Sequence, residues 1–434
     1  MLAGPWLLAL AGAAAGSAGT LASLGPLRLR ADAFPSAVIT LAALAQVVVL
    51  PLVALRTDRA RAKQRVLLVC ATLGALVAVG LAATSGDEWL AAGLAFFVGS
   101  VLWSVGDVAW NGMLPGLAAG GDYEAVSARG SAVGYVGGGL ILALDLALLE
   151  LRGVFGIGEA TAVRICFLTG AAWWLVFCLP AARRLRHVER HPAERHPAER
   201  HRAEGGAGGA GPMAPLTSVR SQLRLVRSMP ATARFLVAYL CFADAMSAVI
   251  SLSSTFLTHQ LFHDDATAAS PFLFSLILAV QFVAMGGALA AARLANRYGP
   301  KLVLAANLVI WCLAIFFAWA VLDNLVEAVA MGLVIGVALG GTSTLSRSLF
   351  ARMVPAGREA VFFSFYEVSS QGTSWIAPLI FTVVVDVTGS FRQAILSLVV
   401  LFVVGLVLLA RVDPTRAAGE AAGVSLPSPT LAAD

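Results

Sequence analysis

Apolar runs recur along nearly the whole chain, and each is long enough to cross a bilayer. A helix needs roughly twenty mostly apolar residues to span the hydrocarbon core. With 59% hydrophobic and 13% charged residues, the composition excludes an ordinary soluble protein. The expected spans are Pro5 to Leu24, Ser36 to Leu55, Val66 to Thr84, Leu90 to Leu114, Ser131 to Leu149, Ala162 to Pro180, Phe235 to Phe256, Pro271 to Leu294, Leu302 to Val321, Leu325 to Leu345, Phe362 to Val385 and Ala394 to Ala410.

A polar insert divides these spans into two sets of six. It contains repeats of His, Glu, Arg and Pro followed by a glycine-rich run, a composition that cannot bury enough apolar surface to fold. The chain is therefore predicted to be an all-α polytopic membrane protein with 12 transmembrane helices. We expect an N-terminal six-helix bundle over 1–180, a flexible cytoplasmic linker over 181–233, a C-terminal six-helix bundle over 234–411 and a disordered cytoplasmic tail over 412–434.

The Lys and Arg residues favour the loops on one side. With the N-terminus in the cytoplasm, the inner loops and tail hold 25 of the 30 Lys and Arg residues. Because cytoplasmic loops carry an excess of these residues, both termini are predicted to be cytoplasmic. Within the linker, Leu216 to Ser228 could form a short amphipathic helix on that side. The inner loop after Leu345 is expected to carry Arg347, Arg352 and Arg358.

Two inner loops share a basic pattern. They read V-A-L-R-T-D-R-A-R-A-K-Q-R after the second span and G-A-L-A-A-A-R-L-A-N-R-Y-G-P-K after the eighth. Both resemble the cytoplasmic loop signature of the major facilitator superfamily, in which an acidic residue and an Arg stabilise one conformation. That resemblance implies a conformational latch at Asp58 and Arg59, with a second copy at Asn296 and Arg297. Asn296 replaces the acidic residue, so the second latch would be a neutral hydrogen bond at best. The alternative for either loop is a basic segment that only fixes the orientation.

Other motifs narrow the resemblance. S-R-S-L-F-A-R-M-V-P-A-G-R-E-A and F-Y-E-V-S-S-Q-G-T-S-W are similar to bacterial relatives of the fungal autophagy-related vacuolar amino-acid effluxer, and the similarity extends from about Phe34 to Val412. It implies the major facilitator fold, alternating access, amino acids as the first substrate class and a bacterial cytoplasmic membrane. Export is the favoured direction because G-x-x-x-G-Y-x-G-G-G, from Gly130 to Gly139 in the fifth span, resembles the antiporter motif of drug and proton exchangers. Two departures stand out. The family's first-helix motif is not found in Met1 to Leu24, and Gln371 stands where a basic residue is common.

Polar side chains interrupt three of the spans. A carboxylate within such a span costs roughly 2.5 to 3.5 kcal/mol, so it usually faces a protein-lined or wet interior. Residues four apart share a helix face, and Pro378 marks an expected bend after one such stripe. The alternative reading is interhelical hydrogen bonding that only holds the bundle together. The residues predicted for a substrate or proton pathway are Asp107, Asn111, Asp244, Tyr366, Glu367, Gln371 and Trp375.

Several function classes lack support in the sequence. There is no nucleotide-binding loop, nucleophile elbow or zinc motif, so neither enzyme activity nor a cofactor nor a metal is expected. No basic run is interleaved with aromatic residues, so no nucleic-acid partner is expected. The prediction is a monomeric secondary active transporter for a small-molecule substrate, coupled to protons, in a lipid bilayer. The alternative is a non-transporting membrane scaffold or sensor derived from a degenerate permease, which the altered first helix would support.

Overall fold

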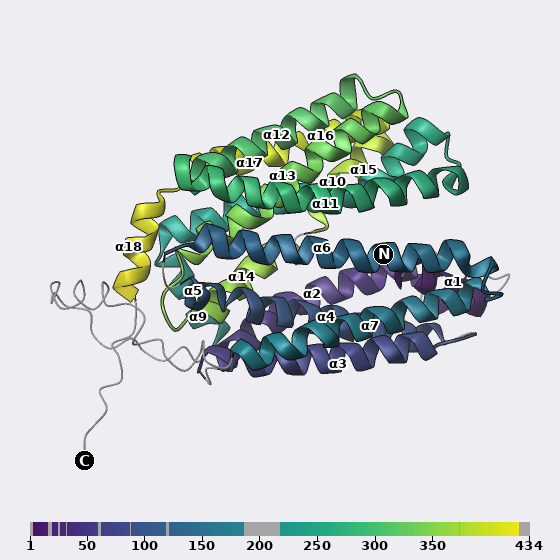
Figure 1. Cartoon of the computed structure of the whole chain (residues 1–434), viewed down its shortest axis with the longest axis horizontal. Coiled ribbons are helices and arrows are strands. Elements are labelled where there is room, and N and C mark those ends of the chain that lie inside the picture. The colour runs from purple at the N-terminus through teal and green to yellow at the C-terminus, as the bar shows by residue number, and fades with distance from the viewer. Residues whose placement is uncertain are drawn as a thin grey trace, which may run out of the picture.

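The computed structural model is almost entirely helical (Figure 1). It describes residues 3–15, 20–24, 27–31, 33–59, 62–86, 88–118, 121–185, 218–372 and 374–424. The elements before the insert are α1 (Ala3–Ala15), β1 (Thr20–Leu24), β2 (Leu27–Arg30), α2 (Phe34–Arg59), α3 (Lys63–Ala83), α4 (Trp89–Asn111), α5 (Leu114–Leu117), α6 (Tyr123–Glu150), η2 (Leu151–Gly153) and α7 (Glu159–Arg184). Those after it are α9 (Val219–Arg227), α10 (Pro230–Phe262), α11 (Ala266–Tyr298), α12 (Pro300–Ala320), α13 (Leu325–Ala351), α14 (Glu359–Gln371), α15 (Ile376–Thr388), α16 (Phe391–Ser397), α17 (Val399–Ala410) and α18 (Pro414–Val424).

The helices confirm the predicted class of polytopic membrane protein. Within the described residues, 11 helical segments are long and apolar enough to cross a membrane, and each corresponds to a predicted span. One of them, Glu359–Thr388, combines α14 and α15. Its interruption falls between Gln371 and Ile376, before the bend expected at Pro378. Pro378 lies in the first turn of α15 instead, where a missing backbone N–H is tolerated.

The first predicted span differs from the structure. Instead of a helix from Pro5 to Leu24, α1 has 13 residues and is followed by the antiparallel hairpin of β1 and β2. A helix of that length rises about 20 Å, which is shorter than the hydrocarbon core. Glycine-rich sequence follows Ala15, and glycine disfavours helix continuation. The Trp6 indole donates a hydrogen bond to Thr84 Oγ1 at 3.1 Å, so α1 is anchored beside the outer end of α3.

Two groups of helices lie side by side along the long axis (Figure 1). Helices α2, α3, α4 and α7 form one group, and α10, α11, α12, α13 and α17 form the other. Helix α6 packs against α11 and α13, whereas α14 packs against α2 and α4. These two crossings form the interface between the bundles, and they decide which side chains of the two halves can meet.

The segments outside the bundles differ in part from expectation. Residues 186–217 of the predicted linker lie outside the described residues, and α9 occupies the segment predicted to be amphipathic. The tail was expected to be disordered from 412, which is wrong for 414–424, because α18 occupies those residues. The helix is fixed by a tertiary contact: Glu420 Oε2 accepts a hydrogen bond from the Ala231 N–H at 3.1 Å, at the start of α10.

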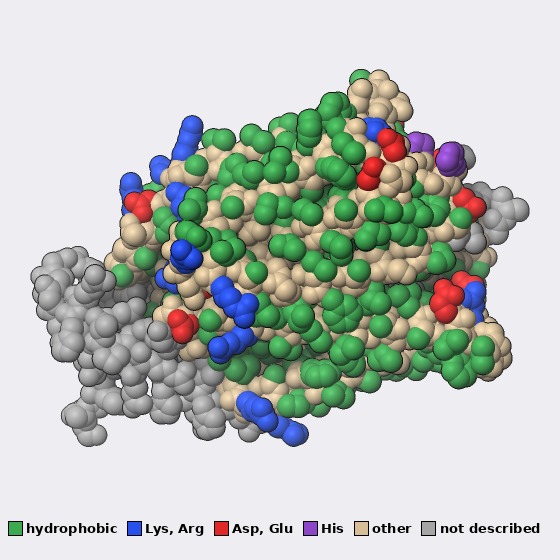
Figure 2. All heavy atoms as spheres, turned by 45° about the horizontal axis from the view of Figure 1, so that its top comes forward, with side chains coloured by type: hydrophobic (Ala, Val, Ile, Leu, Met, Phe, Trp, Pro, Cys, Tyr) green, Lys and Arg blue, Asp and Glu red, His purple; other side chains and the backbone are tan. Residues whose placement is uncertain are grey.

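The surface has the character of a membrane belt. Figure 2 shows apolar side chains across the middle of the molecule, with Lys and Arg gathered toward one end. That end carries α18. We call it the basic end. Large apolar side chains such as Leu41, Leu76 and Val326 are exposed, as lipid-facing residues would be.

Helices α11 and α13 approach closely at a glycine, which gives a stability prediction. A Cβ on Gly340 would overlap the carbonyl oxygen of Ala284 and lie 2.7 Å from the Ala288 amide nitrogen. Gly340→Val should therefore force the helices apart at a cost on the order of 3 kcal/mol. We expect thermal unfolding in detergent to show a clear drop in melting temperature. Gly286→Val is the matched control, because a Cβ there meets nothing within 4 Å. Equal melting temperatures for the two variants would contradict the packing.

Candidate functional site

Asp58 connects the two bundles at the basic end. Its carboxylate accepts hydrogen bonds from the Ala360 N–H at 2.9 Å and from the Val361 N–H at 2.8 Å. Both amides lie in the first turn of α14, whose backbone N–H groups have no partner within the helix. A carboxylate at a helix N-terminus also interacts favourably with the helix dipole. Asp58, which ends α2 and is only 8% exposed, therefore caps a helix of the opposite half.

Charged pairs surround this cap. Lys63 Nζ lies 2.9 Å from Glu359 Oε2 and 3.5 Å from Asp58 Oδ1. Glu124, at the start of α6, accepts hydrogen bonds from Arg352 Nε at 3.1 Å and from Nη2 at 2.5 Å. The Lys63–Glu359 and Glu124–Arg352 pairs each join one half of the chain to the other. Polar contacts thus hold the bundles together at the basic end.

Some of the predicted latch residues take part in these contacts, and others lie on the surface. Asp58 lies at the centre of the contacts, whereas the side chain of Arg59 lies outside the described residues. Asn296 and Arg297 are exposed at the end of α11, where the Arg297 guanidinium lies 5.3 Å from the Tyr298 ring. Neither makes a hydrogen bond or ion pair to the other bundle in the described part of the chain. The two loops are therefore not structurally equivalent, and the latch function itself stays a prediction.

A second polar group lies deeper in the interface. In α4, Asn111 Nδ2 donates a hydrogen bond to Asp107 Oδ2 at 2.7 Å. Glu367 in α14 is 4% exposed, and its carboxyl group is hydrogen-bonded to the side chains of Asp107 and Gln371. Helices α4 and α14 belong to opposite halves of the chain, so their contact brings together four residues predicted for the pathway. We call Asp107, Asn111, Glu367 and Gln371 the carboxyl cluster.

Arg347 also acts on this cluster, and the sequence analysis placed it wrongly in a loop. Helix α13 continues to Ala351, so Arg347 lies within it. Its charge acts on Glu367 and on the hydroxyl groups of three tyrosines, Tyr135, Tyr239 and Tyr366. Apolar residues at Leu345 and Leu349 continue the helical spacing past the predicted end, a signal that could have located Arg347 correctly. Gln371 stands where a basic residue is common in the family. Here Arg347, in α13, provides a positive charge that acts on the same cluster.

The predicted aromatic residues have different environments. The rings of Tyr366 and Tyr239 stack with centroids 3.9 Å apart, and the Tyr366 hydroxyl lies 3.1 Å from Ser346 Oγ. Tyr366 is therefore packed among α10, α13 and α14, with its hydroxyl within reach of the Arg347 charge. Trp375 lies at the break between α14 and α15 and is 53% exposed.

Asp244 lies apart from the carboxyl cluster. Its Oδ2 atom accepts a hydrogen bond from the Ala377 N–H at 2.8 Å, in the first turn of α15. Asp244 is 1% exposed, and its Oδ1 atom has no hydrogen-bond partner among the described residues. This carboxylate from α10 therefore stabilises the start of the second half of an interrupted span. Its role in a pathway stays a prediction.

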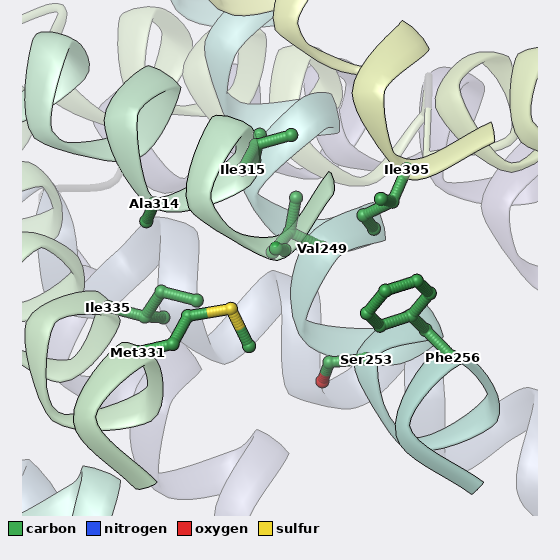
Figure 3. Close-up of a pocket in the computed structure, with 9 residues that line it drawn as sticks. Val249, Ser253, Phe256, Ala314, Ile315, Met331, Ile335 and Ile395 are labelled. Carbon is green, nitrogen blue, oxygen red and sulfur yellow. The ribbon is translucent and has the colours of Figure 1, made fainter. Parts of the chain in front are cut away.

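Two cavities among the described residues differ greatly in volume. A cavity of about 640 Å³ lies between α2, α3, α4 and α7, and its wall includes Gln371 and Ser374 beside the carboxyl cluster. Its other polar side chains include Gln46, Ser100 and Ser104, and Trp103 and Trp174 also line it. By contrast, the apolar space between α10, α12 and α13 measures only about 20 Å³ (Figure 3). That space cannot accommodate a solute, so the larger cavity is the candidate site.

Sequence comparison places the chain among known proteins. It matches the family described as "Vacuole effluxer Atg22 like" over residues 15–422. It is 24% identical to a Bacillus subtilis protein described as the uncharacterized MFS-type transporter YxiO, over 78% of this chain and 76% of the relative. It is 27% identical to autophagy-related protein 22 of Kluyveromyces lactis, over 84% of this chain and 75% of the relative.

Solved structures share the fold. The transporter FucP in its outward conformation superimposes with a TM-score of 0.67 at 16% identity, covering 95% of this chain and 98% of FucP. The human organic anion transporter MFSD10 gives 0.60 at 15% identity, covering 94% and 89%. Both belong to the major facilitator fold, as the resemblance predicted. This multi-pass membrane protein therefore belongs to the Atg22-like family of vacuole effluxers within the major facilitator superfamily.

Proposed function

We propose that the protein is a secondary active transporter that moves a small solute across a cytoplasmic membrane by alternating access. The observation that carries this proposal is the carboxyl cluster where α4 of one bundle meets α14 of the other, in which Asn111 and Glu367 are buried. Charged groups are costly inside a membrane protein, and they mark solute or proton pathways when they lie between bundles. The description of the family as effluxers supports export as the direction. Amino acids are proposed as the substrate class from the sequence resemblance.

The contacts at the basic end account for the conformational change in this proposal. A polar latch at Asp58, Lys63 and Glu359 holds one end of the interface closed. Release of that latch would let the bundles rock and expose the cluster to the opposite side. The positive-inside rule supports the cytoplasm as the location of the basic end. We propose that the protein acts as a monomer with two bundles joined by a linker.

Proton coupling rests on the contact between Asp107 and Glu367. In this proposal the two carboxyl groups hold one proton between them while the interface is closed. When the interface opens, water and solute compete for these groups and the proton can leave. Solute binding and proton release would then be linked through Glu367.

A transport assay in vesicles tests the proposal. The purified protein is reconstituted into liposomes loaded with one labelled amino acid at a time, and an inward or outward proton gradient is imposed. We expect gradient-dependent flux of at least one amino acid, with none from empty liposomes. Absence of flux and of amino-acid exchange for all tested amino acids, from protein that unfolds cooperatively in detergent, would overturn the proposal. That result would favour the scaffold or sensor alternative.

A further inference from the structure

Arg347 is an arginine in the bundle interface whose positive charge has no paired carboxylate. It is half-buried in α13, and its Nε atom is buried without a hydrogen-bond partner among the described residues. No carboxylate of that part of the chain forms an ion pair with it. A guanidinium inside a membrane protein normally pairs with carboxylate or backbone oxygens. Arg347 can therefore accept a further hydrogen-bond acceptor or anionic group beyond those that the described residues supply.

Further polar atoms without partners lie on the same interface. Ser127 Oγ donates a hydrogen bond to the Thr344 carbonyl oxygen at 2.9 Å, which places α6 against α13 one turn from Arg347. Close to this contact, Thr344 Oγ1 and Ser131 Oγ are buried without hydrogen-bond partners among the described residues. Buried polar atoms in folded proteins are usually paired, so unpaired ones on two facing helices indicate that something else occupies the space. These hydroxyl groups can donate to an anion.

The surroundings of Arg347 combine hydroxyl groups with carboxyl groups. Hydroxyl groups of Tyr135, Tyr239 and Tyr366 lie within range of its charge. Its charge also reaches Glu367 and, through it, the rest of the carboxyl cluster. A solute with one negative and one positive group would meet complementary charges at both ends.

The cavity gives this solute room for an uncharged body. Gln371 is hydrogen-bonded to Glu367 and also lines the cavity of about 640 Å³. No Asp, Glu, Lys or Arg side chain lines that cavity, and aromatic rings form part of its wall. An apolar or weakly polar side chain could therefore extend into it from the charged site. The three regions fit the head groups and the side chain of one zwitterionic molecule.

We propose that Arg347 binds the carboxylate of the solute, while Asp107 and Glu367 receive its ammonium group. This assignment rests on the proposed function, because it takes the interface to be the transport site. It goes further by giving the solute's anionic group a specific arginine on α13. If Arg347 served only to balance the charge of Glu367, a carboxylate on the solute would be irrelevant to binding.

Three probes that share the isobutyl group of leucine separate these roles. Leucine carries both charged groups, isovalerate carries only the carboxylate and isoamylamine carries only the ammonium group. Binding is measured by thermal stabilisation of purified protein in detergent across a concentration series. A hydrogen-bonded charge typically contributes enough for about a tenfold to hundredfold change in affinity. We expect Arg347→Gln to weaken leucine and isovalerate binding by that amount and to leave isoamylamine binding within about twofold.

Matched variants keep the test interpretable. Glu367→Gln should do the reverse, weakening isoamylamine and leucine but not isovalerate. Arg293→Gln removes an exposed arginine from α11 and should change none of the three affinities. Arg347→Lys keeps the charge without the planar fork, so an intermediate affinity for leucine is expected. This second variant decides the matter if Arg347→Gln does not fold.

Several outcomes would overturn the assignment. Equal binding of leucine to wild type, Arg347→Gln and Arg347→Lys would do so, as would failure of any carboxylate probe to stabilise the wild type. The proposed function fails separately. Binding that depends on Arg347 without flux in vesicles would retain the site and reject transport, whereas flux that survives Arg347→Gln unchanged would retain transport and reject the site.

Discussion

Glu367→Gln is expected to abolish accumulation of solute driven by a proton gradient while preserving exchange of solute across the membrane. The glutamine retains the size of Glu367 and can still hydrogen-bond to Asp107 and Gln371, so the interface should keep its shape. What it loses is the ability to take up and release a proton. Uptake into vesicles under an imposed gradient should therefore fall to the level of empty liposomes, whereas counterflow of labelled against unlabelled solute should continue at solute concentrations high enough to offset the weaker binding.

The control for this change is Glu150→Gln, which removes an exposed carboxylate at the end of α6. It should leave accumulation unchanged. Wild-type accumulation by Glu367→Gln would exclude Glu367 as the coupling residue and shift attention to Asp107. Loss of both accumulation and counterflow, together with a lower melting temperature, would assign Glu367 a structural role, as the alternative of interhelical hydrogen bonding predicts.

The membrane spans could be predicted from sequence because the free energy of insertion depends on local composition. A run such as Leu302 to Val321 is apolar whatever its neighbours are, and α12 occupies nearly the same residues. The unusual cost of a carboxylate inside a span likewise identified Asp107 and Glu367 without any tertiary information. Burial of Glu367 between α4 and α14 agrees with that argument.

Partners in three dimensions could not be predicted in the same way. Asp244 and Glu367 look alike in sequence, since both are single carboxylates in apolar spans. In the structure Asp244 caps the start of α15, whereas Glu367 faces Asp107. This difference depends on where α15 begins. Arg347 was missed for a related reason. From sequence alone, a charged residue near the end of a span is assigned to the following loop. Its place within α13 becomes clear only when the packing of α13 against α6 is known.

The extent of the first helix also could not be predicted from the sequence. Its segment is uncharged, so hydropathy alone predicted a span from Pro5 to Leu24. Whether such a weakly apolar segment spans the bilayer depends on its tertiary contacts. In the structure, Trp6 is fixed by Thr84 and packs against Phe167, with ring centroids 6.2 Å apart. These contacts hold α1 at the outer part of the bundle.

Asp58→Ala is expected to shift the protein toward a state that is open at the basic end. The substitution removes the acceptors for both the Ala360 and Val361 amides and the carboxylate beside Lys63, and leaves the Lys63–Glu359 pair in place. Each charge-assisted hydrogen bond typically contributes about 1.5 to 3 kcal/mol, so the open state should gain tenfold or more in population. Spin labels at Arg56 and Arg411, both exposed near the basic end, should report a longer distance.

The labels require a background in which the five cysteines are replaced, since all are free and some are only half-buried. Asp122→Asn is the control, because Asp122 is exposed before α6 and its side chain does not cap that helix. Its distance distribution should match the wild type. The same distribution for Asp58→Ala would remove Asp58 from the latch and leave the Glu124–Arg352 pair as the contact that closes this end.

Comparison with Asp58→Asn and Lys63→Gln identifies which part of the latch matters. Asparagine has a single acceptor oxygen and no charge, so one of the two amide contacts and the attraction to Lys63 are lost. Lys63→Gln preserves both amide contacts and removes only the bridging charge. If capping of α14 stabilises the closed state, the open population should rise most for Asp58→Ala, less for Asp58→Asn and least for Lys63→Gln. An effect of Lys63→Gln as large as that of Asp58→Ala would instead mean that the ion pairs, rather than the helix cap, hold the two bundles together.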